Sequence, residues 1–192
     1  MSKKILIIIT SAVFFFSSFQ AYAQRHIAGQ NVVTLDTYVL KQHGVGLSWG
    51  RCSFSGQSVF GASFLSGKEE PCKVTVGEED ELISYTAKSR DWIASGGYLF
   101  RIIGDRSHSL NLMLGGTVDI GARTYEVPSE GIPIPEVNFI YGVSPIIKGE
   151  YFPKGCLSIN LQFRPRLQLY GHNMSEKVFY PEFGIGCSYY FL

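Results

Sequence analysis

The segment from Leu110 to Tyr125 alternates between apolar residues and polar or small residues with a period of two. Its even-numbered positions are mainly leucine, valine, isoleucine and alanine, whereas its odd-numbered positions include Asn111, Asp119 and Arg123. A period of two is typical of a strand with one apolar and one polar face. The segment predicts a strand of about 16 residues, well beyond the roughly 5 to 6 residues that are most common in globular domains.

A second segment, Leu157 to Tyr170, repeats this alternation more sharply. Both segments exceed the roughly 9 to 11 residues that a strand needs to cross a bilayer, and both carry charged residues on the polar face in mid-strand. A soluble sandwich or lipocalin-like barrel also alternates, but it turns its apolar face inward. The strand length and the mid-strand charges favour a transmembrane barrel, with the apolar face toward lipid and the polar face toward the lumen.

Turn signals divide the chain into eight predicted strands. Their ranges are Val32–Leu40, Gly44–Arg51, Gln57–Leu65, Asp91–Ile103, Ser109–Tyr125, Asn138–Phe152, Leu157–Tyr170 and Val178–Leu192. Tight turns follow the second, fourth and sixth strands, whereas long polar loops, Ser66–Arg90 and Glu126–Val137, follow the third and fifth. Short turns on one rim and long loops on the other are typical of outer-membrane barrels. We therefore predict an all-β, eight-stranded antiparallel outer-membrane-type β-barrel with both termini on the periplasmic side.

The N-terminus has the pattern of a secretory signal peptide. Lys3 and Lys4 precede the apolar run Ile5–Phe16, and Ala21 and Ala23 provide the small residues of a cleavage site. The apolar run is shorter than the roughly 20 residues of a membrane-spanning helix. We expect residues 1–23 to be removed and residues 24–192 to form a single barrel domain, exported to the outer membrane of a Gram-negative cell.

Charged residues on the predicted inward faces nearly balance in sign. They are Asp36, Arg101, Asp119, Arg123, Lys148, Glu150, Arg164, Arg166 and Glu182. Because the interior of an eight-stranded barrel is just wide enough for side chains, we expect these residues to pair across the lumen and leave no wide pore. An ion or proton path along the same residues is the alternative. Pro165 cannot donate to a strand ladder, so we expect a bulge or a local break there.

The net charge of the chain and the positions of its cysteines bear on possible binding partners, disulfides and metal sites. Seventeen basic residues against 16 acidic residues give no field that would attract nucleic acid, so direct DNA binding is not expected. The four cysteines, in an exported chain, suggest two disulfides. The predicted topology nevertheless separates Cys52 from Cys72 and Cys156 from Cys187, so we expect neither bridge. Their spacing is not that of a metal site.

Catalytic signatures in the sequence are thin. The four histidines are scattered and lie in no recognisable catalytic motif. Some small outer-membrane barrels modify lipid with a histidine and a serine near the outer rim, and His43, His172 and Ser175 would be the candidates here. Turn polarity explains these residues equally well. We expect a non-enzymatic protein that needs no cofactor.

Two segments resemble a known family. In Gly96–Arg106 a tyrosine-containing strand ends in a Gly-Asp-Arg turn, and Phe183–Phe191 is a Gly-x-Gly strand with terminal aromatic residues. In this order the segments are similar to the TraO family of conjugal transfer proteins from Bacteroides-type conjugative transposons.

The resemblance covers roughly Trp92 to the C-terminus. It implies a non-enzymatic outer-membrane component of a conjugative DNA-transfer apparatus related to type IV secretion. Its expected partners are outer-membrane lipid and other transfer-apparatus proteins. The alternatives are a generic barrel for adhesion or envelope integrity, a lipid-modifying barrel enzyme, and a soluble secreted β-barrel binding module.

Overall fold

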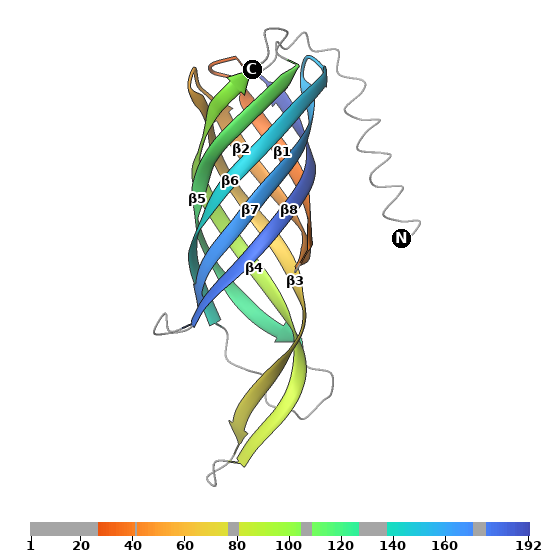
Figure 1. Cartoon of the computed structure of the whole chain (residues 1–192), viewed down its shortest axis with the longest axis vertical. Helices are drawn as coiled ribbons and strands as arrows, with labels where there is room; N and C mark the ends of the chain where they lie inside the picture. The colour runs from red at the N-terminus through yellow and green to blue at the C-terminus, as the bar shows by residue number, and fades with distance from the viewer. Residues whose placement is uncertain (1–26, 41, 77–80, 105–108, 127–137, 171–175) are drawn as a thin grey trace, which may run out of the picture.

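The computed structural model describes residues 27–40, 42–76, 81–104, 109–126, 138–170 and 176–192, and it confirms the predicted closed barrel (Figure 1). Each strand pairs antiparallel with its neighbours in sequence, and β1 closes the cylinder against β8. The strands are β1 (Asn31–Leu40), β2 (His43–Cys52), β3 (Gly56–Val76), β4 (Glu81–Gly104), β5 (Leu110–Glu126), β6 (Asn138–Lys154), β7 (Leu157–Tyr170) and β8 (Glu176–Phe191). The predicted signal peptide lies outside the described residues. Among the described residues, no helix is long and apolar enough to cross a membrane.

The outer wall of the barrel is apolar, as the alternation predicts. On β5, Leu110 and Ile120 are 55% and 56% exposed in the isolated chain, whereas Asp119 is fully buried. Ten residues at about 3.3 Å each, tilted by about 40°, cover roughly 25 Å along the barrel axis, which matches the apolar band of a transmembrane barrel. An exposed apolar wall of this height requires lipid around it.

The predicted loop Ser66–Arg90 is wrong, because β3 and β4 continue far past the rest of the wall. The last β2–β3 pair is His43–Ser66 and the last β4–β5 pair is Lys88–Glu126, but β3 and β4 stay paired up to Val76–Glu81. Figure 1 shows this two-stranded ribbon projecting from the rim opposite the C-terminus. The ribbon carries charges and Pro71, and its sequence lacks the one-sided apolar pattern that predicts the other strands.

A β-bulge marks the base of this ribbon. The register of the β3–β4 pair shifts between Ser66 and Glu69, so that Gly67 and Lys68 together oppose Ser89. A Cβ atom at Gly67 would lie 2.2 Å from the Ser89 Oγ, so glycine allows the two strands to approach closely here. Bulges bend and twist the strand that carries them, and this one lies where the ribbon leaves the barrel.

Prolines on neighbouring strands interrupt the wall on the other side of the barrel. Pro165 of β7 is the register partner of Pro181 of β8, and the β6–β7 register places Pro145 opposite Pro165. The β6–β7 pairing stops at Val143–Leu167 and resumes in the same register at Ile147–Phe163. The predicted local break at Pro165 is therefore present, because neither Pro145 nor Pro165 has an N–H to donate. We call Pro145, Pro165 and Pro181 the proline line.

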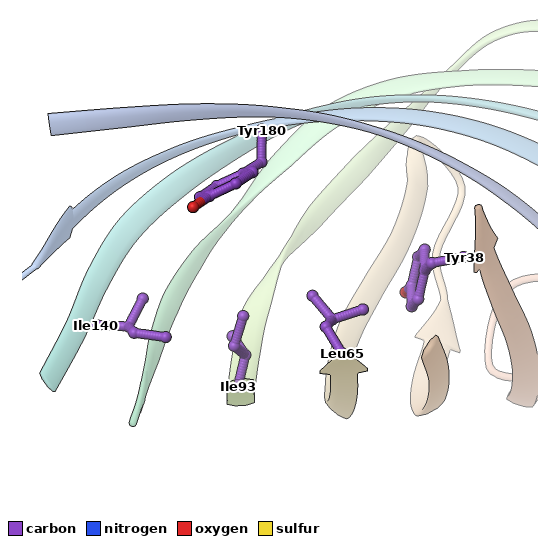
Figure 2. Close-up of a cluster of buried hydrophobic side chains, with 5 residues drawn as sticks. All are labelled: Tyr38, Leu65, Ile93, Ile140 and Tyr180. Atoms are coloured by element: carbon purple, nitrogen blue, oxygen red, sulfur yellow. The ribbon is translucent and has the colours of Figure 1, made fainter. Parts of the chain in front are cut away.

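Apolar side chains fill the lumen at two levels. Toward the ribbon, the buried residues contact one another from five strands across the barrel (Figure 2): Tyr38, Leu65, Ile93, Ile140 and Tyr180. Toward the short-turn rim, two further clusters are packed, Leu99 with Met113 and Ile146, and a second around Phe152 and Tyr190. The ion network around the middle of the lumen thus has apolar clusters on both sides of it along the barrel axis.

Candidate functional site

Asp119 on β5 is the centre of a buried ion network in the middle of the lumen. Its Oδ1 atom lies 2.6 Å from the Arg164 Nη2 atom, and its Oδ2 atom lies 3.6 Å from the Arg166 Nη1 atom. Thr117 donates a hydrogen bond to Oδ1 at 3.0 Å, and Ser144 donates one to Oδ2. Both arginines lie on β7, two strands away from β5, so one carboxylate links β5, β6 and β7.

The two arginines carry the network further around the barrel. The Arg166 Nε atom donates to Glu182 on β8 at 2.6 Å, and its Nη2 atom donates to Ser63 on β3 at 3.3 Å. The Arg164 Nη2 atom donates to Ser95 on β4 at 2.8 Å. Arg164 and Arg166 flank Pro165, so these side-chain bonds cross the lumen at the level where the backbone ladder is broken.

A second pair closes the lumen near the ribbon. The Arg123 Nε and Nη2 atoms donate to the two carboxylate oxygens of Asp91 at 2.7 and 2.8 Å. Gln42 also donates to Asp91 at 2.8 Å, and the Arg123 guanidinium lies over the ring of Tyr180. The predicted inward set omits Asp91, because this residue opens a predicted strand. Side chains alternate between the two faces of a strand. Because Trp92 and Ala94 point outward, Asp91 must point inward, and this alternation would have identified it.

A third pair lies toward the short-turn rim. Lys148 and Glu150 are 2.9 Å apart on β6, and the Tyr190 hydroxyl donates to Glu150 at 2.7 Å. Asp36, only 5% exposed, borders a cavity of about 30 Å³ together with Gln162 and Arg164. A polar cavity of this size holds about one or two water molecules.

Arg101, predicted as part of the lumen set, lies instead at the short-turn rim. It is half-buried, and its Nη2 atom is 3.4 Å from the carbonyl oxygen of Phe54 in the β2–β3 turn. Arg101 lies three residues before the end of β4 at Gly104, and its N–H donates to the carbonyl of Ser55 in the same turn, so the side chain is at the edge of the lumen. The other predicted lumen residues are all buried.

The lumen is therefore a packed interior. Ion pairs occupy its middle and both its ends, and apolar clusters lie between them. Buried ion pairs with several hydrogen bonds hold side chains in fixed positions, and removing one partner leaves an uncompensated charge. Within the described residues the arrangement suits a rigid support better than a channel.

Three of the four cysteines are assigned in the structure. Cys52, Cys156 and Cys187 are all unbridged, which excludes both a Cys52–Cys72 and a Cys156–Cys187 bond in this structure. The Tyr190 N–H donates to the Cys156 carbonyl at 2.8 Å, so Cys156 faces the end of the chain, as predicted.

The residues considered for lipid chemistry are not brought together in the described part of the chain. His43 is exposed at the start of β2, whereas His172 and Ser175 lie outside the described residues. No group of three or more histidine, cysteine, aspartate or glutamate side chains in the described ranges could hold a metal ion.

The β3–β4 ribbon is the second candidate site. Its eight register pairs, from Glu69–Lys88 to Val76–Glu81, give it a length of about 25 Å. At its base, Arg90 and Glu126 form a 2.6 Å ion pair on the outer surface, with both side chains about half exposed. An exposed ion pair marks the level at which the wall meets water, so the ribbon lies outside the apolar band.

Solved structures share this architecture. The chain is similar to Neisserial surface protein A, with 11% identity and a TM-score of 0.50 over 84% of this chain and 95% of that one. It is also similar to Ail, the attachment invasion locus protein of Yersinia pestis, solved in complex with the heparin analogue sucrose octasulfate, with 11% identity and a TM-score of 0.52 over 86% of this chain and 100% of that one. The chain has the fold of outer-membrane barrels. At this identity the likeness extends to the fold alone.

Comparisons of the sequence itself give no assignment. No protein-family model matches the chain, and no curated protein matches it significantly. The resemblance to conjugal transfer proteins stays a prediction.

Proposed function

We propose that this protein is a non-enzymatic outer-membrane barrel that anchors the β3–β4 ribbon outside the cell and uses it to bind a macromolecular partner. One observation carries the proposal: the lumen is packed with side chains, whereas two strands continue beyond the wall for eight register pairs. A barrel built for transport needs free space in its lumen. A barrel built for display needs a rigid support and a projecting element.

The rigidity of the support is part of this proposal. The network around Asp119 links strands on opposite sides of the barrel, and the bulge at Gly67 lies directly at the base of the ribbon. A ribbon held at a fixed base loses less conformational freedom on binding than a free loop would. Ail, which shares the fold, is by its name an attachment protein, and this supports surface binding as a role for such a barrel.

Conjugative DNA transfer is the second candidate function. The family-like segments Gly96–Arg106 and Phe183–Phe191 favour it. In that role the ribbon would contact other proteins of the transfer apparatus rather than DNA, since the chain carries a formal net charge of only +1.

A variant with a shortened ribbon tests the display function. Residues 68–88 are replaced by an Asn-Gly turn that joins Gly67 to Ser89, which removes the terminal Lys88–Glu126 pair and leaves the rest of the wall intact. Cells that display the wild-type protein should attach to a panel of host and bacterial cells more strongly than cells that display the variant. Both proteins must first be shown in the outer membrane fraction, with a heat-dependent shift in detergent gels. Equal attachment would reject the proposal.

Mating assays test conjugation separately. Deletion of the gene from a donor cell should lower the transfer frequency without slowing growth, and the wild-type gene should restore it. The shortened ribbon, or a short turn in place of Glu126–Val137, should impair transfer more than uncharged polar residues at Asp119 and Arg123. A deletion strain that transfers at full frequency rules out the conjugation role and leaves attachment as the proposed function.

A further inference from the structure

The projecting ribbon has two edges along which no described strand is paired. Within the described ranges, β3 beyond Ser66 pairs with β4 alone, and β4 before Lys88 pairs with β3 alone. In an isolated two-stranded ribbon, every second backbone N–H and C=O group of each strand points away from the partner strand. Such edges are templates for the addition of another strand.

The two edges differ in the residue types that they carry. The β3 edge contains Pro71, which has no N–H, and the charged residues Glu69, Glu70 and Lys73. Prolines and charges on an edge strand are the devices by which proteins prevent strand addition.

The β4 edge lacks these devices. From Leu82 to Ala87 its sequence is LISYTA, with no proline and no charge. Isoleucine, tyrosine and threonine are residue types that favour strands. Charged residues bound this stretch at both ends, Glu81 near the tip and Lys88 near the barrel. The sequence thus protects one edge of the ribbon and leaves the other open.

Building on the proposed display function, we infer that the β4 edge from Leu82 to Ala87 binds an extended polypeptide segment of a partner protein as an added strand. Lipid is a poor occupant, because the exposed Arg90–Glu126 pair places the ribbon outside the apolar band. A second copy in the same membrane is also a poor occupant. In a second copy β4 has the same direction along the barrel axis, so it cannot add as an antiparallel strand, and its β3 edge carries Pro71 and charged residues.

The register defines the chemistry of the partner segment. An antiparallel strand added to β4 runs from the barrel toward the tip. Opposite charges on facing residues of two paired strands attract. The best segment therefore has an acidic residue opposite Lys88, uncharged β-branched or aromatic residues in the middle, and a basic residue opposite Glu81. A segment with a central proline should not bind.

Peptide binding to the full-length barrel in lipid nanodiscs tests the inference. The probe is a fluorescent peptide of alternating threonine and valine that starts with glutamate and ends with lysine. Two further peptides carry backbone N-methyl groups, one on the odd-numbered and one on the even-numbered residues. In strand addition only one set of N–H groups faces β4, so one methylated peptide should bind like the parent and the other at least tenfold more weakly. Equal binding of the two would overturn the inference.

Cross-linking and a charge reversal identify the edge. A photo-reactive version of the peptide should cross-link to residues 82–87, and cross-links confined to residues 69–76 would overturn the assignment. The double variant Glu81→Lys with Lys88→Glu should bind a peptide with reversed end charges better than the parent peptide. Arg51→Glu is the matched control, since Arg51 is exposed at the opposite rim, and it should keep the original preference. The two proposals can fail separately. If the shortened ribbon abolishes cell attachment but N-methylation does not change peptide binding, the proposed display function is retained and strand addition is rejected.

Discussion

The substitution Asp119→Asn removes the central anion of the lumen network without changing its size. Asp119 is fully buried and faces two arginines whose side chains are 7% and 0% exposed. Arg166 keeps Glu182 as a partner at 2.6 Å, but the partners that Arg164 keeps, the hydroxyl groups of Ser95 and Thr117 among them, are neutral. The variant thus leaves one buried guanidinium without an anion within salt-bridge distance.

The expected cost follows from this geometry. Breaking a buried ion pair by removing one partner costs about 3 to 5 kcal/mol, because the remaining charge stays buried and unpaired. Asp119→Asn should therefore lower the free energy of unfolding by about 3 kcal/mol or more. Ser144→Ala removes one neutral donor to the same carboxylate, so its cost should be smaller, about 1 to 3 kcal/mol.

Urea unfolding in lipid vesicles, followed by tryptophan fluorescence, measures these values. The two tryptophans, Trp49 and Trp92, are 46% and 59% exposed on the outer wall, so they report the transfer of the wall from lipid to water. A double-mutant cycle with Arg164→Met isolates the pair, and its coupling energy should exceed about 1 kcal/mol. If Asp119→Asn costs less than about 1 kcal/mol and the cycle is additive, the network does not hold the barrel together.

Further predictions concern the wall, the lumen and the cysteines. Val118→Arg or Leu161→Arg, deeper on the lipid side of β5 and β7, should destabilise the barrel by about 2 to 4 kcal/mol, whereas Leu112→Arg or Ile103→Arg should cost about 0 to 1 kcal/mol, because these two residues are register partners near the short-turn rim; equal costs at the four positions in the same urea assay would contradict the depth assignment. In planar bilayers the wild-type protein should show no sustained conductance, and steady open-channel currents would contradict the packed lumen. Peptide mass mapping without reductant should detect neither a Cys52–Cys72 nor a Cys156–Cys187 bridge, and either bridge would show that the strand register differs from the one described.

The sequence predicts most of the barrel because lipid imposes a simple rule on it. The strands that face lipid alternate along most of their length, and the predicted bounds of β7 are those that the structure shows. The ribbon cannot be predicted in the same way, because a strand outside the apolar band need not alternate between apolar and polar residues. Its two strands are recognised only by their mutual register, which is a non-local property.

The lumen network is predictable in composition but not in pairing. Parity along each strand gives the inward charges, yet which strands face one another across the lumen depends on the stagger of the closed barrel. Arg101 shows the same limit, since its position near the end of β4 brings its side chain to the β2–β3 turn and not to the lumen network. The sequence predicts the break at Pro165, but its alignment with Pro145 and Pro181 requires the register of three strands.

The proline line also determines which part of the barrel wall deforms most easily. The β1–β8 ladder, where the two ends of the barrel meet, runs without interruption from Asn31–Phe191 to Leu40–Glu182. The β6–β7 ladder is interrupted at the prolines and again between Tyr151 and Lys154. The joint that closes the barrel is thus continuous, whereas a line through the second half of the chain is compliant. Lateral pressure from a bending or thinning membrane should flatten the barrel along β6 and β7, and leave the joined ends in place.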